Sequence, residues 1–125
     1  MEKYINLAGR ILLAHLFLFA GLSKIGAYAG TQSYMASMGV PGGLLPLVIL
    51  LEAGGGLALI VGWQTRLVAY ALALFTVVAA VIFHSNLSDQ LQMIMFMKNW
   101  SIAGGLLLLA VHGAGSYSLD QRSRK

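Results

Sequence analysis

Glu52 is the one carboxylate in an apolar run over residues 44–62, and no other charge follows it before Arg66. An acid at that depth in hydrocarbon is costly, and it is usually kept for a partner, a proton or a substrate. Glu52 is therefore the first candidate for chemistry in this sequence, as a proton or cation site or as one half of a buried ion pair.

Two cations in other apolar segments can approach this acid. At about 1.5 Å of rise per helical residue, Glu52 lies roughly 12 Å and Lys98 roughly 8 Å from the outer ends of their helices. The two side chains can therefore meet, with Asn99 as a hydrogen-bonding neighbour. Arg10 lies roughly 9 Å from the inner end of the first helix and can reach toward Glu52 from below. Arg10, Glu52, Lys98 and Asn99 form the predicted ionic or ligand pocket, with a net positive charge.

Arg10 belongs to a stripe on the first helix. Arg10, Phe17, Gly21 and Lys24 are seven, four and three residues apart, a spacing that places all four on one helical face. If that face points inward, Lys24 lies at the outer mouth of the pocket.

A purely structural interpretation stands beside the ligand pocket. A buried ion pair between two helices can serve only to fix their register, and its desolvation cost means that it need not stabilise the fold. Glu52 and Lys98 can form such a pair. Arg10 can likewise extend its long side chain to the inner interface as an anchor.

The other potential ligands limit the chemistry. His15 lies near mid-membrane, where a histidine bonded within the bundle is more typical than a metal ligand, and His84 and His112 end their helices at opposite faces. We therefore expect no metal site. With no cysteine, the chain cannot hold an iron–sulfur cluster or exchange thiols by itself. Any redox role must borrow a cofactor, most simply a lipid-soluble quinone, or belong to a partner.

The composition places these residues in a membrane. Hydrophobic residues make up 58% of the chain and charged residues 10%, whereas soluble domains carry about 25% charge. Four apolar segments are each long enough to cross about 30 Å of hydrocarbon as a helix. We predict one all-α domain over residues 1–125, an up-down bundle of four transmembrane helices at about 4–25, 44–62, 66–84 and 93–113.

The first outer loop, residues 26–43, is long enough for structure of its own. Thr31 is a candidate N-cap and Gly39 a stop signal, which predicts a short helix in the membrane interface. A simple connection is the alternative.

The basic residues predict the orientation, because Lys and Arg gather on the cytoplasmic side of membrane proteins. Among the residues that flank the spans, which leaves aside Arg10 and Lys98 within them, one predicted side has only Lys24. The other has Lys3, Arg66, Arg122, Arg124 and Lys125. We therefore expect both termini in the cytoplasm. The formal net charge of +4 is a topology signal and does not indicate nucleic-acid binding.

Small residues indicate where helices can approach closely. The candidates for close packing are Gly21, Gly54, Gly55, Gly56, Gly104 and Gly105. A flat bound ligand can alternatively occupy the space beside these glycines.

Several motifs follow one another along nearly the whole chain. They are Arg10 with Phe17-x-x-x-Gly21-x-x-Lys24, then Gly39-Val40-Pro41, Leu51-Glu52-x-Gly54-Gly55-Gly56 with Gly62 and Arg66, Lys98-Asn99 with Gly104-Gly105, and Gly113-x-Gly115 before Ser118-Leu119-Asp120. This order resembles the DoxX family of small bacterial membrane proteins, and is closest to its enterobacterial inner-membrane members.

The resemblance implies a four-helix protein of the bacterial inner membrane. Some members of the family are named as the small membrane subunit of thiosulfate:quinone oxidoreductase, and others as part of a membrane oxidoreductase complex linked to thiol homeostasis. Those activities belong to complexes, and no catalytic motif accompanies the family signature here.

Three functional interpretations follow. The first is a redox-associated or quinone-linked membrane subunit whose polar pocket binds a quinone or a lipid, together with redox partner proteins. The second is a small transporter or channel that uses Glu52 as a proton or cation site, as a homo-oligomer. The third is a structural or assembly protein without activity of its own.

Overall fold

The chain folds into helices of two kinds, long spans and short pieces at the ends of the bundle. A computed structural model describes residues 2–84, 86–115 and 117–123, and all regular structure within these ranges is helical. The elements are α1 (Glu2–Gly26), α2 (Tyr28–Ser37), η1 (Gly42–Leu44), α3 (Leu45–Ile49), η2 (Leu50–Gly54), α4 (Gly55–Val61), α5 (Thr65–Phe83), α6 (Gln90–His112) and α7 (Leu119–Ser123). Four stretches are long and apolar enough to cross a membrane, namely α1, Gly42–Val61, α5 and α6. This confirms the predicted fold class, an all-α membrane protein with four transmembrane helices.

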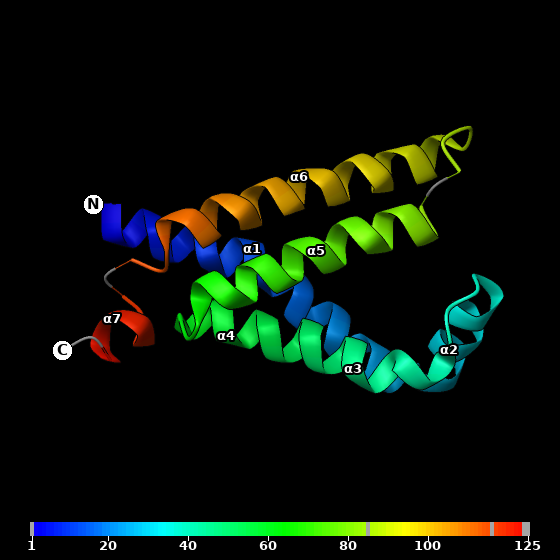
Figure 1. Cartoon of the computed structure of the whole chain (residues 1–125), viewed down its shortest axis with the longest axis horizontal. Coiled ribbons are helices and arrows are strands. Elements are labelled where there is room, and N and C mark those ends of the chain that lie inside the picture. Colours follow the sequence, from blue (N-terminus) through cyan, green and yellow to red (C-terminus); the bar gives the residue numbers. More distant parts are fainter. Residues whose placement is uncertain (1, 85, 116, 124–125) are drawn as a thin grey trace.

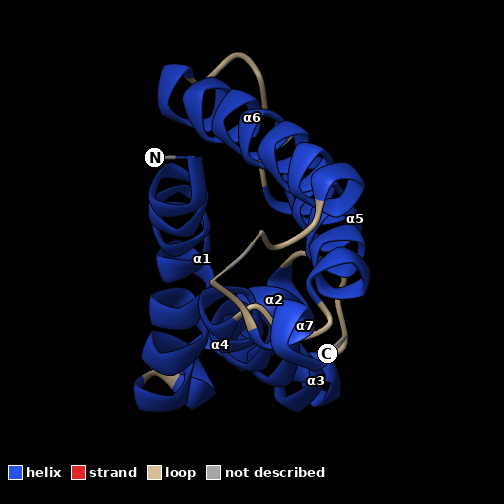
Figure 2. Cartoon of the chain, turned by 90° about the vertical axis from the view of Figure 1, so that its left-hand side faces the viewer, coloured by secondary structure: helices blue, strands red, loops and turns tan. Residues whose placement is uncertain are grey.

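These spans pair into two helical hairpins. The second span, Gly42–Val61, packs along α1 through η2 and α4, while α5 packs along α6. Both termini and α7 lie at one end of the bundle, here called the terminal end, and α2 lies at the opposite or distal end (Figure 1). Seen onto the terminal end, the α5/α6 pair lies across from α1 and the second span (Figure 2).

Glycines set the spacing within the first hairpin. A Cβ atom on Gly21 would lie 2.6 Å from the backbone nitrogen of Ala53, and one on Gly56 would lie 2.7 Å from that of Leu18. No side chain fits at these two places, so the backbones of α1 and the second span touch. Lipid tails supply no hydrophobic force between helices, and such close packing is what can hold them together.

The other predicted packing glycines are less tightly enclosed. A Cβ atom on Gly55 would meet the side chain of Leu72 on α5 at 3.3 Å, and one on Gly105 would make an ordinary contact with Leu13. Gly54 has only its own helix nearby, and the space beside Gly104 is open. The structure therefore differs from the expectation at Gly104, because this glycine lies on the exposed side of α6.

The well-packed core fills the terminal half of the bundle. Leu59, Leu72 and Leu106 come from three spans and are fully buried, and Ala14 and Phe17 of α1 pack against them. Distal to this core the two hairpins separate, so their facing surfaces are free to line a cavity.

The distal loop contains a helix, as the sequence predicts, but with a different start. The helix α2 begins at Tyr28, after Ala27, and Thr31 lies within its first turn, where its hydroxyl donates to the Ala27 carbonyl at 2.8 Å. Thr31 is therefore not the N-cap, and the prediction was wrong on this point because the N-cap is Ala27, four residues earlier. Gly39, with φ +83°, lies just after the helix ends.

The C-terminal segment closes the terminal end. Both carboxylate oxygens of Asp120 accept hydrogen bonds from the start of α5, one from the Gln64 amide at 2.7 Å and one from the Thr65 amide at 2.9 Å. The Asp120 amide in turn donates to the Gly62 carbonyl at 2.8 Å. These bonds connect the end of the chain to the tight turn between the second and third spans.

Candidate functional site

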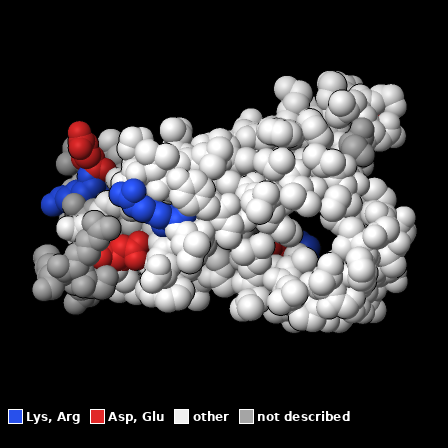
Figure 3. Space-filling model, viewed as in Figure 1, with Lys and Arg blue, Asp and Glu red and all other residues white. Residues whose placement is uncertain are grey.

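A cavity of about 480 Å³ lies in the distal half of the bundle, where the two hairpins separate. Its walls come from α1, α2, the second span, α5 and α6, and most of them are apolar. The polar side chains that line it are Lys24, Tyr34, Glu52, Thr76, Lys98 and Asn99, together with Thr31 and His84 at the distal end. Figure 3 shows an opening in the distal half with acidic and basic surface inside it, whereas the other charges visible on this face gather at the terminal end.

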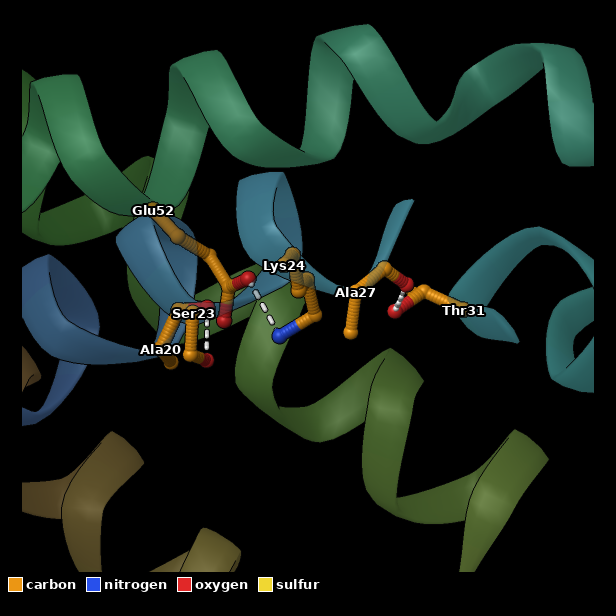
Figure 4. Close-up of polar contacts among 6 residues, drawn as sticks. All are labelled: Ala20, Ser23, Lys24, Ala27, Thr31 and Glu52. Atoms are coloured by element: carbon orange, nitrogen blue, oxygen red, sulfur yellow. Dashed lines mark hydrogen bonds and ion pairs between the residues drawn. The ribbon is translucent and has the colours of Figure 1, made fainter. Parts of the chain in front are cut away.

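Glu52 forms an ion pair in this cavity, and its partner is Lys24. The Lys24 ammonium lies 2.7 Å from Oε1 of Glu52, with 29% of the lysine side chain and 7% of the glutamate side chain exposed (Figure 4). The sequence suggested Lys98 as the partner and Lys24 only as the pocket mouth. The structure differs because the contact of Gly21 with Ala53 draws α1 against the second span. Lys24, one turn after Gly21, is thereby brought beside the acid.

The backbone around Glu52 departs from the α-helix. Residues Leu50–Gly54 form a π-helical turn, η2, between the α-helices α3 and α4. Such widened turns are rare, and they occur frequently at functional sites. In this chain the turn holds the one acid of the cavity and presses Ala53 onto Gly21.

Lys98 and Asn99 reach the cavity from α6, on the other side. The Asn99 side-chain amide donates to the Thr76 carbonyl of α5 at 3.2 Å. That bond ties α6 to α5 in the cavity wall. Lys98 is an exposed residue that lines the cavity, and its ammonium forms no ion pair or hydrogen bond with the residues that the structure describes.

Arg10 lies away from the cavity, in the terminal half. It is 1% exposed, and its guanidinium donates to the Leu59 carbonyl at 3.2 Å and to the Tyr117 carbonyl. The Asp120 carboxylate also acts on it electrostatically. The structure thus separates Arg10 from the predicted pocket, because α4 and the C-terminal segment offer its side chain backbone acceptors in the terminal half. Its contacts are those of a structural anchor.

The three histidines occupy separate places. His15 is exposed on α1, with its Nδ1 2.5 Å from the Leu12 carbonyl of its own helix. His84 lines the distal cavity, where its Nδ1 lies 3.2 Å from the Gln92 side chain, and His112 is near the terminal end. Within the described ranges, no group of three His, Cys, Asp or Glu side chains is placed to hold a metal ion.

Sequence reasoning did not assign Tyr34, Thr76 or His84 to the pocket. Thr76 carries the one hydroxyl in the otherwise apolar stretch of α5 from residue 71 to 83, which was a usable signal. Tyr34 could not be assigned from its spacing alone, since its place depends on how α2 folds back. Its ring stacks on Phe83 of α5, with centroids 5.4 Å apart, and connects the two hairpins at the distal end.

Comparison with known proteins places the chain among small inner-membrane proteins. The profile of the DoxX family matches residues 5–85. Inner membrane protein YqjF of Escherichia coli (strain K12) is 55% identical over 119 residues, which cover 95% of this chain and 92% of that protein. Inner membrane protein YphA of the same organism is 37% identical over 123 residues, or 93% of this chain and 88% of that protein. No solved structure matches the chain.

The family match covers more than half of the chain and includes Lys24 and Glu52, and both relatives extend over nearly all of it. Four apolar spans agree with the location that the names of those relatives state. The chain is a multi-pass inner-membrane protein that belongs to the DoxX family.

Proposed function

We propose that this chain is the ligand-holding membrane subunit of a redox system, and that a lipid-soluble molecule with a polar head group, a quinone or a lipid, occupies the distal cavity. The observation that carries the proposal is the cavity itself. Its volume falls within the range of about 300–1,000 Å³ that is usual for small-molecule sites. Its walls combine extensive apolar surface with a few convergent polar groups, as such sites do.

The side chains present suit a molecule of this kind. Lys98 offers ammonium hydrogens to an oxygen of the head group, and the apolar walls accept a ring or a chain. A quinone would supply the electron-carrying chemistry when bound. Glu52 and Lys24 lie in the same cavity and can hold a proton at a carboxylate oxygen or an ammonium nitrogen. The redox association itself rests on the resemblance to family members named as quinone-linked subunits.

We also propose that the terminal end faces the cytoplasm, since the Lys and Arg count favours that orientation. The cavity then opens in the outer half of the membrane. A ligand can reach it from the lipid, because the molecule has an opening in that half (Figure 3).

Mass spectrometry of the purified protein tests the proposal. Protein extracted in a mild detergent should retain about one equivalent of a quinone or lipid after washing. Ala20→Phe, which places a ring in the cavity wall, should lose it, whereas Tyr70→Phe on the exposed face of α5 should keep it. Equal retention by the wild type and Ala20→Phe would exclude the cavity as the binding site. A measurement of the oxidation or reduction of added quinone then distinguishes a subunit of a redox system from a structural protein.

A further inference from the structure

The charges of the cavity do not balance. Two lysines, Lys24 and Lys98, line it, and Glu52 is its one carboxylate among the described residues. The whole sequence contains four acids. Glu2 lines a groove at the terminal end and Asp120 is bonded to the Gln64–Thr65 turn there, so neither is near the distal cavity.

The fourth acid is engaged elsewhere on α6. Asp89 accepts a hydrogen bond from the Leu91 amide at 3.0 Å as the N-cap of α6. It lies nine residues before Lys98, or roughly 13 Å along the helix at about 1.5 Å per residue. Glu52 is therefore the one acid near enough to serve the cavity, and it is already paired with Lys24 at 2.7 Å.

Lys98 is thus a cation without a counter-charge. It lines a cavity whose other walls are mostly apolar and include Phe17, Phe75 and Ile102. An ammonium group at membrane depth is costly, and ionisable groups within membrane spans normally pair or line a ligand path. The other polar side chains of the cavity do not supply the missing negative charge, because Asn99 carries a neutral amide and Tyr34 and Thr76 carry neutral hydroxyl groups.

From this charge count we infer that the distal cavity takes an amphiphile with an anionic oxygen head group, and that Lys98 is the residue that binds the head group. A carboxylate or phosphate oxygen at Lys98 brings the net charge of the cavity to zero. The apolar surface of α1, α5 and α6 accepts the hydrocarbon part, which can continue through the opening into lipid. The inference rests on the proposed function, in that the cavity must be a ligand site, and it narrows the ligand to an anionic class.

Native mass spectrometry of the full chain in detergent measures this selectivity. The probes are phosphatidylglycerol, zwitterionic phosphatidylethanolamine with the same acyl chains, oleate and neutral decylubiquinone. Phosphatidylglycerol or oleate should bind at least tenfold more tightly than the zwitterionic lipid. A preference for phosphatidylglycerol over oleate identifies a phospholipid source, and the reverse preference identifies a free carboxylate.

Variants locate the selectivity at Lys98. Lys98→Met should abolish the preference for anionic probes, while Lys98→Arg should keep it. Lys3→Met removes one positive charge at the terminal end and should change nothing. Thermal denaturation of each variant verifies that it is folded before its lipid preference is compared with that of the wild type. If Lys98→Met does not fold, Lys98→Arg serves as the charge-preserving test.

Two outcomes would overturn the inference in different ways. If decylubiquinone binds as tightly as the anionic probes, and Lys98→Met binds it equally well, the ligand is neutral: the inference fails while the proposed function stands. If no probe distinguishes the wild type from the cavity-filling Ala20→Phe, the cavity is not a binding site and both proposals fail.

Discussion

At the scale of single residues, the structure gives different surroundings to three charges that the sequence placed together. Glu52 pairs with Lys24, Lys98 faces the cavity, and Arg10 binds carbonyl groups in the terminal half. Depth along a helix was estimated well enough to bring Lys98 to the same cavity as Glu52. Depth alone could not decide which lysine pairs with Glu52, because the pairing depends on how each helix is rotated about its axis.

The ion pair can be measured by a double-mutant cycle. Lys24→Met leaves the mostly buried Glu52 carboxylate without its partner, and we expect a loss of about 2 kcal/mol of stability, below the usual 3–5 kcal/mol because the lysine is partly exposed. Adding Glu52→Leu should recover most of this loss. Stability is followed by unfolding in mixed micelles of increasing SDS fraction.

Lys98→Met provides the control for that cycle. It should show little coupling to Glu52, since its ammonium is not bonded to the acid in the structure. Stronger coupling of Glu52 with Lys98 than with Lys24 would mean that Glu52 pairs with Lys98 in the membrane.

At the scale of elements, the position of Glu52 depends on the contact between α1 and η2. Gly21→Ala would place a Cβ atom 2.6 Å from the Ala53 backbone nitrogen and must push the two elements apart. Overpacking of this kind costs about 1–3 kcal/mol. We expect that loss in SDS unfolding, together with weaker coupling between Lys24 and Glu52.

A matched substitution on α6 isolates the steric effect. Gly104→Ala also replaces a helical glycine, but the space beside Gly104 is open. It should be neutral or stabilise the protein by up to about 1 kcal/mol, since alanine favours the helix. Equal destabilisation by the two substitutions would argue against a backbone contact at Gly21.

The start of α5 depends on a residue 55 positions later in the chain. Asp120→Ala removes the acceptor of the Gln64 and Thr65 amides, and loss of such a cap costs about 1–2 kcal/mol. Hydrogen exchange should speed up at these two amides and much less at the middle of α5. Asp120→Asn, which keeps one acceptor oxygen, should give an intermediate effect. Unchanged exchange at both amides in Asp120→Ala would exclude the cap.

At the scale of the whole molecule, the sequence predicted the features that hydropathy controls. Four spans, a short connection between the second and third of them, and a helix in the distal loop follow from local composition, and the observed helix ends lie within a few residues of the expected ones. The π-helical turn at Glu52, the docking of the C-terminal segment and the stacking of Tyr34 on Phe83 come from contacts between distant segments. No local pattern encodes such contacts.

The orientation of the whole bundle decides which side of the membrane the cavity serves. The sequence has no cysteine, so single cysteines report position without background. Asn86→Cys lies in the distal turn between α5 and α6, and Trp63→Cys lies in the exposed turn at the terminal end. In spheroplasts, a membrane-impermeant maleimide should label Asn86→Cys at once and Trp63→Cys only after permeabilisation. The labelling of each is read by mass shift on a gel.

The reverse labelling pattern would invert the topology. The cavity would then open in the cytoplasmic half of the membrane, and Lys24 and Lys98 would lie nearer the side where basic residues normally gather. The Lys98 charge would then have an explanation in topology alone, without a ligand. The expected pattern removes that explanation, because it leaves Lys24 and Lys98 as the basic residues of the outer half, with Glu52 as the one acid among the described residues that line their cavity.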